Sequence, residues 1–304
     1  MKKNFLAITD LNFDEIKEMF TLASELKKKT KSGKKHHILE GQTLAMIFQK
    51  PSARTRVSFE VGMFQLGGHA LYLSPDDIGL GKRESVADIA RVFSRYNDGI
   101  MARVFSHSNV EELGQYASIP VINGLSDLLH PCQVMGDMFT ILEHRGSLKG
   151  LKLTYIGDGN NLANSWLNIA SRIPMQLHLA LPEGYDPDEN VLSRAKDSNC
   201  SEIKIYRDPK EAVQGVEFIY TDVWASMGQE SEAQKRKKIF KDYQVNNTLL
   251  KNAKSDVKVM HCLPAHRGDE ITDEVMDGPH SIVFDEAENR LHIQKAIMVS
   301  LMKK

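Results

Sequence analysis

The stretch QTLAMIFQKPSARTRVSFEVGMFQLGG, residues 42–68, joins an apolar run to a helical pattern through a short polar turn. The apolar run, residues 42–49, predicts a buried strand. The pattern that starts at Ala53 predicts a helix that ends at Gly67 and Gly68. A strand that passes directly into a helix is the repeating unit of α/β folds with parallel sheets.

The same alternation runs through the rest of the chain. Further strands are expected at residues 69–74, 99–104, 119–125, 151–159, 175–182, 218–223, 257–263 and 281–286. Further helices are expected at residues 12–29, 85–96, 131–146, 160–173, 229–238 and 289–304. Strands that alternate with helices predict parallel sheets with helices on both faces.

The alternation restarts after the helix at Pro131, which predicts two domains. We expect an α/β fold of two doubly wound parallel-sheet domains joined by interdomain helices. The first is expected at residues 1–132 and the second at residues 133–288, with the final helix, residues 289–304, packing back on the first. A chain of 304 residues is long enough for both to bury a core.

Composition and charge narrow the function classes. The net charge of -1 argues against general binding to nucleic acid. No apolar run approaches the roughly 20 residues that span a membrane, so we expect a cytoplasmic protein. The three cysteines, Cys132, Cys200 and Cys262, are too few and too scattered for a disulfide framework or a zinc knuckle. We expect no metal ion and no cofactor.

The polar turn after residues 42–49 has the features of an anion site. Ser52 is a natural N-cap, and the first-turn N–H groups of a helix have no intrahelical partners. Those groups and the helix dipole favour an anion, to which Arg54 adds a planar guanidinium. A capped helix with surface arginines explains the same residues equally well.

A second turn, IGDGNN at residues 156–161, also follows an expected strand. It resembles the start of a dinucleotide-binding fingerprint, but Leu162 stands where the third glycine would be. Asn160 and Asn161 could instead offer amides to a carboxylate. Simple turn chemistry is the simpler explanation of this motif taken alone.

Three more motifs carry candidate polar groups. His130 precedes Pro131 at an expected helix N-terminus, which favours a neutral imidazole that donates a hydrogen bond, although a purely structural histidine is the alternative. Asp222 ends an expected strand, which suits a cationic ligand group, although a helix cap in a loop is the alternative. Cys262 closes another strand, where it is either a small buried hydrophobe or an activated thiol.

Taken in order, seven motifs resemble the ornithine carbamoyltransferase family: PSARTRVSFE, DIARVFSRYNDGIMAR, HPCQ, GDGNN, DVWASMG, HCLP and EAENR. The resemblance runs from about Phe48 to beyond Arg290. It implies transfer of the carbamoyl group of carbamoyl phosphate to the δ-amine of L-ornithine, giving citrulline and phosphate, as in arginine biosynthesis. It also implies two α/β domains and a homotrimer with sites at subunit interfaces.

The resemblance also implies roles for individual residues. The residues expected to bind carbamoyl phosphate are Ser52, Ala53, Arg54, Thr55, Arg103, His130, Gln133, Cys262, Leu263 and Arg290. Those expected to bind ornithine are Asn161, Asp222, Ser226 and Met227. Catalytic roles fall to Arg54, His130, Cys262 and Asp222. The first domain would then bind carbamoyl phosphate and the second ornithine.

The chain departs from the family pattern at two positions. Ala53 stands where the family usually has threonine, so one side-chain hydroxyl is missing while the backbone N–H remains. Gly79 stands where bacterial relatives often have glutamine, in a loop that reaches a neighbouring subunit's site. Lys82 or Arg83 is a candidate replacement for that lost contact with phosphate.

The implied mechanism is direct acyl transfer. The neutral δ-amine attacks the carbamoyl carbon and phosphate leaves, without a covalent enzyme intermediate, because phosphate is already a good leaving group. The protein aligns the substrates and stabilises the growing charge on oxygen. Arg54, His130 and Cys262 are residue types suited to that oxyanion.

Other substrates and other classes of function remain open from the residues alone. Aspartate would need further cations, and Ala265 stands where the aspartate enzymes carry arginine. Putrescine lacks the carboxylate that Asn161 would bind, and acetylated ornithine lacks the ammonium that Asp222 would hold. A non-catalytic carbamoyl phosphate binder and a nucleotide-dependent oxidoreductase are the alternatives of other classes.

Overall fold

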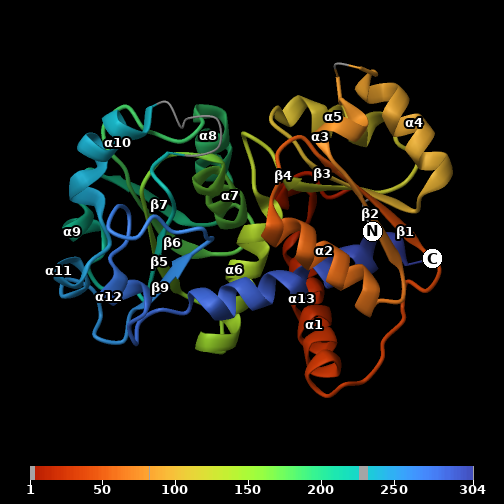
Figure 1. The fold of residues 1–304 in the computed structure, drawn as a ribbon. Helices are drawn as coiled ribbons and strands as arrows, with labels where there is room; N and C mark the ends of the chain where they lie inside the picture. Colours follow the sequence, from red (N-terminus) through yellow and green to blue (C-terminus); the bar gives the residue numbers. More distant parts are fainter. Residues whose placement is uncertain (1–3, 82, 226–231, 304) are drawn as a thin grey trace. The chain divides into compact units, whose positions relative to one another are not determined.

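The computed structural model describes residues 4–81, 83–225 and 232–303 of the chain. The chain divides into two compact units (Figure 1). Unit 1 comprises Met1–Phe139 and Asn289–Lys304, and unit 2 comprises Thr140–Glu288. Helices α6, Pro131–Arg145, and α13, Val283–Met302, each begin in one unit and end in the other. The expected architecture of two parallel-sheet α/β domains joined by helices is confirmed.

Unit 1 contains a four-stranded parallel sheet in the order β2-β1-β3-β4. Its strands are β1 (Thr43–Phe48), β2 (His69–Leu73), β3 (Gly99–Arg103) and β4 (Val121–Leu125). The helices that lie wholly in this unit are α1 (Phe13–Lys31), α2 (Ala53–Gln65), α3 (Pro75–Ile78), α4 (Val86–Tyr96) and α5 (His107–Tyr116), with a short 3-10 turn, Ile8–Asp10.

Both faces of this sheet are covered by helices. On one face Ala45 and its neighbours pack against α4 and α5, and Ile89 and Val110 belong to that core. On the other face α13 approaches the sheet so closely that a Cβ at Gly99 would lie 3.0 Å from Met302 Sδ. Every residue from the second to the last of β1 is buried for this reason.

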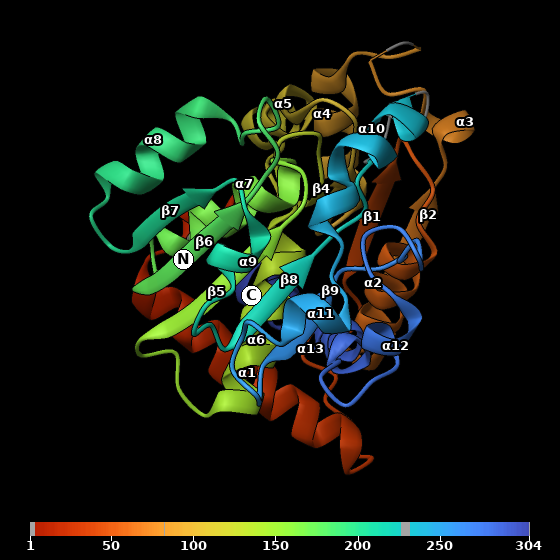
Figure 2. The same cartoon turned by 90° about the vertical axis from the view of Figure 1, so that its left-hand side faces the viewer.

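Unit 2 contains a five-stranded parallel sheet in the order β7-β6-β5-β8-β9, which Figure 2 shows strand by strand. Its strands are β5 (Leu151–Ile156), β6 (Met175–Ala180), β7 (Glu202–Tyr206), β8 (Phe218–Thr221) and β9 (Lys258–His261). Its helices are α7 (Asn161–Ala170), α8 (Glu189–Asp197), α9 (Pro209–Ala212), α10 (Ala233–Phe240), α11 (Asn247–Leu250) and α12 (Asp273–Met276), with a 3-10 turn, Lys241–Tyr243.

Adjacent residues of β8 show that this sheet is also covered on both faces. Tyr220 lies 5.3 Å from Trp166 of α7, measured between ring centroids. Its neighbour Ile219 packs on the opposite face with Leu249 of α11 and Val275 of α12. Because side chains alternate across a strand, the two contacts place helices on both sides of the sheet.

The prediction of a strand at residues 281–286 was wrong. Only Ser281 pairs with β9, through a single bridge to Val259, and α13 begins at Val283. Asp285 and Glu286 then lie in the first helical turn, where the helix dipole stabilises carboxylates. Strand β7, a short edge strand with partly exposed side chains, was not predicted from the sequence.

None of the helices in the described part of the chain is long and apolar enough to cross a membrane.

Candidate active site

In unit 1 the candidate residues gather where the strand order reverses. The chain moves outward from β1 to β2 on one side and from β3 to β4 on the other. Ligands of open α/β sheets bind outside the carboxyl ends of the strands at such a point. Ser52 follows β1, and Arg103 is the last residue of β3 beside it. A register shift between Ala102 and Arg103 interrupts the pairing with β4.

The turn into α2 forms the expected cap. The Ser52 hydroxyl accepts a hydrogen bond from the Thr55 N–H at 3.3 Å and donates one to Thr55 Oγ1 at 3.1 Å. Ala53 and Arg54 are exposed at the first helical positions. Arg56, by contrast, donates to Glu60 at 2.9 Å. Of the two arginines in this turn, the exposed Arg54 is therefore the one available to an anion.

A network of buried polar side chains holds this turn in place. The Arg290 guanidinium donates to Thr55 Oγ1 at 2.7 Å and to Gln133 Oε1 at 3.2 Å. Gln133 in turn donates from Nε2 to Asp137 Oδ1 at 2.7 Å. All four side chains are at most 5% exposed. Residues of α2, α6 and α13 are thus tied together by charge-assisted hydrogen bonds.

His130 is neutral in this environment. Burial lowers its pKa well below the ordinary value of 6.5, and the guanidinium groups of Arg290, Arg103 and Arg54 lower it further. A neutral imidazole can donate one hydrogen bond without adding a charge, as the position before Pro131 had led us to expect.

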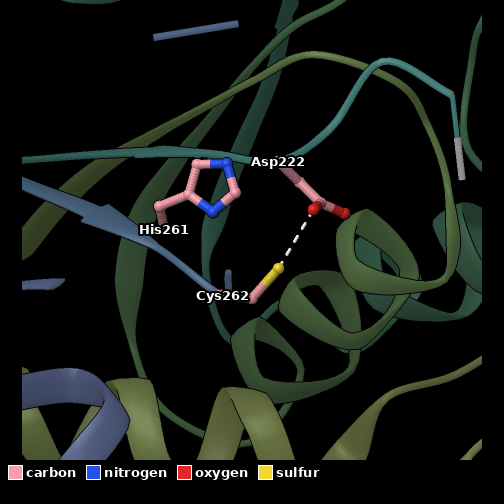
Figure 3. A group of neighbouring side chains, drawn as sticks. All are labelled: Asp222, His261 and Cys262. Carbon is pink, nitrogen blue, oxygen red and sulfur yellow. Dashed lines mark hydrogen bonds between the residues drawn. The ribbon is translucent and has the colours of Figure 1, made fainter. Parts of the chain in front are cut away.

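In unit 2 the strand order reverses between β5 and β8. Asn160 follows β5 and caps α7, accepting from the Leu162 N–H at 2.9 Å. The Asn160 Nδ2 group donates to Asp222 Oδ2 at 2.9 Å, just beyond the end of β8. From the next strand, β9, the Cys262 thiol donates to Asp222 Oδ1 at 3.0 Å (Figure 3). The Asp222 carboxylate is therefore held from two sides.

Both glycines of the turn after β5 are required by its geometry. Gly157 has a φ of 145°, which side-chain-bearing residues rarely adopt. A Cβ at Gly159 would lie 2.3 Å from the carbonyl carbon of Asp186. Leu162 is 1% exposed and packs in the core. The turn is thus explained by close backbone packing and by the Asn160 cap, without a dinucleotide.

The loop after β9 is held by a buried network. His261 Nδ1 accepts from the Leu263 N–H at 2.8 Å, and His261 Nε2 lies 3.1 Å from Glu270 Oε1. The backbone N–H of His261 donates to the Glu286 carboxylate at 2.9 Å. Leu263 itself has a φ of 58°.

Those contacts bear on metal binding. Ligand atoms of Asp222, His261 and Cys262 lie within 4.8 Å of one another. Both ring nitrogens of His261 are engaged, one as an acceptor and one with a buried carboxylate. A metal ion would have to break one of these bonds, so this trio does not fit a preformed metal centre.

One buried ion pair was not anticipated. Arg236 lies in the helix expected at residues 229–238, and its charged side chain is only 7% exposed. It donates to Asp158 at 2.8 Å and to the Trp224 carbonyl at 2.9 Å. The two partners of the ion pair are 78 residues apart, and no local pattern predicts such a contact.

Some of the remaining residues expected at the site lie within the described part of the chain, and others lie outside it. Asn161 is the first residue of α7, beside Asn160. Ser226, Met227 and Lys82 lie outside the described residues. Gly79 has a φ of 52°, and a Cβ there would lie 2.8 Å from Arg83 Cβ. This backbone conformation favours glycine over any residue with a side chain.

Comparisons with known proteins agree with this geometry. A family model described as "Aspartate/ornithine carbamoyltransferase, carbamoyl-P binding domain" matches residues 3–143. A second, described as "Aspartate/ornithine carbamoyltransferase, Asp/Orn binding domain", matches residues 149–301.

Individual relatives match over nearly their whole length. The ornithine carbamoyltransferase of Syntrophus aciditrophicus is 55% identical over 302 residues, which is 99% of this chain and 100% of the relative. That of Thermococcus kodakarensis is 54% identical over 304 residues, covering 99% and 96%. The solved structure of ornithine carbamoyltransferase from Pyrococcus furiosus has a TM-score of 0.95 at 52% identity and covers 99% of this chain and 97% of that one.

Proposed function

The chain belongs to the aspartate/ornithine carbamoyltransferase family, and from that premise we propose how its residues perform carbamoyl transfer. The reaction moves the carbamoyl group of carbamoyl phosphate to the δ-amine of L-ornithine and gives L-citrulline and phosphate. The observation that carries the proposal is the group of polar residues where the strand order of unit 1 reverses: the cap of α2 at Ser52, Arg103 at the end of β3, and Arg290 bonded to Thr55 and Gln133.

The residues of unit 1 are suited to carbamoyl phosphate. The phosphate binds at the N-terminus of α2, where the free N–H groups of the first turn, including that of Ala53, favour an anion. Further contacts with the phosphate come from Ser52, Thr55 and Arg103. The guanidinium of Arg54 offers the phosphate two parallel N–H donors. His130 and Gln133 bind the carbamoyl group, and Arg290 fixes Gln133 and Thr55 in place.

The residues of unit 2 are suited to ornithine. Asp222 holds the α-ammonium group, because its carboxylate is fixed at the end of β8 by Asn160 and Cys262. Asn161 binds the α-carboxylate, with Ser226 and Met227 as the further proposed contacts. Cys262 and Leu263, at the end of β9, retain their proposed contacts with the carbamoyl group.

The chemistry proceeds by direct displacement. The lone pair of the neutral δ-amine forms the new N–C bond, and the C–O bond to phosphate then breaks. The proton lost by the amine leaves with the phosphate. Arg54 and His130 donate hydrogen bonds to the carbamoyl oxygen as it gains negative charge. Because the pKa of His130 is depressed, this donor stays neutral and does not compete for the amine's proton.

Assembly, direction and location are further parts of the proposal. We propose a homotrimer, for which the exposed apolar side chains of α2, Phe64 at 78% and Val57 at 54%, supply a candidate contact surface. A cytoplasmic location is proposed with it. A biosynthetic role is supported by a relative from Pyrococcus furiosus that is 53% identical and named "Ornithine carbamoyltransferase, anabolic". Light scattering of the purified protein tests the trimer.

One assay tests the function. The protein is incubated with carbamoyl phosphate and, in turn, L-ornithine, L-aspartate, putrescine or N-acetylornithine, and carbamoylated product and phosphate are both measured. Equal amounts of citrulline and phosphate, with ornithine alone, are expected. Product from another amine would change the assigned substrate, and tight binding of carbamoyl phosphate without product would identify a non-catalytic binder.

A further inference from the structure

Gln49 lies at the point in unit 1 where the strand order reverses, and it has no role in the scheme above. It follows the last residue of β1, three positions before Ser52. Its backbone N–H donates to the Arg103 carbonyl at 2.8 Å. Its side-chain Oε1 accepts from the Phe105 N–H at 2.8 Å.

The side chain of Gln49 replaces a backbone bond. If the parallel ladder continued, the N–H of Phe105 would bond to the main-chain carbonyl of Gln49. Here it bonds instead to the side-chain amide oxygen of the same residue. Pro51, two residues later, has no N–H and cannot continue the ladder. The chain can therefore turn away into the cap at Ser52 while the end of β3 stays attached to β1.

The other end of the same amide reaches a third loop. Gln49 Nε2 donates to the Leu80 carbonyl at 3.4 Å. Leu80 is 4% exposed and belongs to the core beneath α4. Gly79 and Arg83 flank it, joined by a hydrogen bond from the Arg83 N–H to the Gly79 carbonyl at 2.9 Å.

We propose that Gln49 is a positioning residue that holds three loops in register for binding phosphate: the loop of Ser52, the strand end of Arg103, and the loop of Gly79. It does not touch the substrate in this scheme. Its backbone and its amide oxygen set the distance between the cap of α2 and the Arg103 guanidinium. Its amide nitrogen restrains the third loop. The inference rests on the proposed assignment of carbamoyl phosphate to unit 1.

Gln49→Met tests the inference, because methionine has nearly the same length and keeps the backbone bond but offers neither amide contact. We expect KM for carbamoyl phosphate to rise about tenfold, the ratio that corresponds to losing roughly one net hydrogen bond. KM for ornithine should stay within about twofold, because binding to unit 2 is untouched. Calorimetric titration with carbamoyl phosphate alone should show the same loss.

Gln49→Glu supplies the rescue. Its carboxylate still accepts from the Phe105 N–H but cannot donate to Leu80, so it should restore most of the affinity for carbamoyl phosphate. Gln244→Met is the matched control, since Gln244 joins loop carbonyls at Gly268 and Asp269 in unit 2. The control should leave KM for carbamoyl phosphate unchanged.

Unchanged KM for carbamoyl phosphate in Gln49→Met would overturn the inference, as would equal losses in Gln49→Met and Gln49→Glu. If Gln49→Met does not fold, hydrogen exchange of the Phe105 amide in Gln49→Glu and Gln49→Ser replaces it. Exchange should be slow in the first variant and fast in the second, and equal rates would contradict the proposal. Absence of citrulline from the wild-type protein would instead refute the proposed function.

Discussion

At the scale of single residues, neighbouring side chains of one type have different environments. Arg54 is exposed at the start of α2, whereas Arg56 is bonded to Glu60 and lies 4.0 Å from the Tyr72 ring centroid. Ala53 occupies the first helical position with its methyl group exposed. The turn proposed to bind phosphate therefore has room for a further donor at residue 53.

Ala53→Thr is expected to strengthen binding of carbamoyl phosphate. The new hydroxyl would lie in the first turn of α2, and a hydrogen bond to a charged group contributes about 1.5–3 kcal/mol before competition with water. We expect KM for carbamoyl phosphate to fall about three- to tenfold. Ala53→Val, which has the same shape without the hydroxyl, is the control. Equal KM values for the two variants would show that residue 53 does not contact phosphate.

The depressed pKa of His130 predicts how stability depends on pH. Below pH 6.5 the His130 side chain becomes protonated in the unfolded chain but stays neutral in the folded protein. Stability is therefore fully present above pH 6.5 and falls as the pH drops below it, by up to about 1.4 kcal/mol per pH unit.

His130→Gln should lose this dependence. Urea denaturation between pH 7.5 and 5.5 is expected to show a steeper decline for the wild-type protein than for the variant. The pKa values of His36 and His107 are also lowered, chiefly by burial, but they contribute equally to both proteins. Parallel profiles would mean that His130 ionises normally in the folded state.

At the scale of secondary-structure elements, the candidate residues of unit 2 that the structure describes all follow strands. Asn160, Asp222 and Cys262 extend from the carboxyl ends of β5, β8 and β9, which are adjacent in the sheet. Helix α10 adds Arg236, which bonds to the loops after β5 and β8 through Asp158 and the Trp224 carbonyl. A single arginine therefore connects two of the three loops.

Arg236→Met should destabilise unit 2 strongly. The variant leaves the Asp158 carboxylate, 8% exposed, without its cation, and breaking one partner of a buried pair costs about 3–5 kcal/mol. Burial already raises the pKa of Asp158, so protonation below neutral pH should relieve part of the loss.

The double variant Asp158→Asn/Arg236→Met separates charge from packing. It should regain much of the stability measured by urea denaturation at pH 7, because no unpaired charge remains. Additive losses from the two substitutions would show that the ion pair contributes nothing specific. KM for ornithine, measured on the folded fraction, should rise in Arg236→Met and recover in part in the double variant.

At the scale of the whole molecule, local patterns predicted the fold better than the site. The apolar run and the cap at Ser52 define β1 and α2 because their signals lie within a few residues. The prediction of a strand at residues 281–286 failed because the β-branched residues there favour a strand, whereas the acidic residues favour the first turn of a helix.

The site residues could not be assembled from local patterns. Arg290 is separated by 235 residues from Thr55 and by 157 from Gln133, so their contacts are fixed only by the fold. The resemblance of the ordered motifs to a known family supplied those residues before the structure joined them. Gln49 was missed because its side chain bonds to a backbone carbonyl and a backbone amide, which leave no signature in a sequence. Arg236 was missed because its carboxylate partner, Asp158, lies 78 residues away.

The central claim is that carbamoyl phosphate is bound chiefly through Arg54 in unit 1, whereas ornithine is bound through Asp222 in unit 2. Calorimetric titration with carbamoyl phosphate in the absence of ornithine tests it directly, using the wild-type protein, Arg54→Ala and Asp222→Asn. We predict that Arg54→Ala loses at least tenfold in affinity for carbamoyl phosphate, because a charged donor to the ligand is removed. Asp222→Asn should bind carbamoyl phosphate like the wild type while its KM for ornithine rises. Normal binding by Arg54→Ala, or lost binding by Asp222→Asn, would contradict the account.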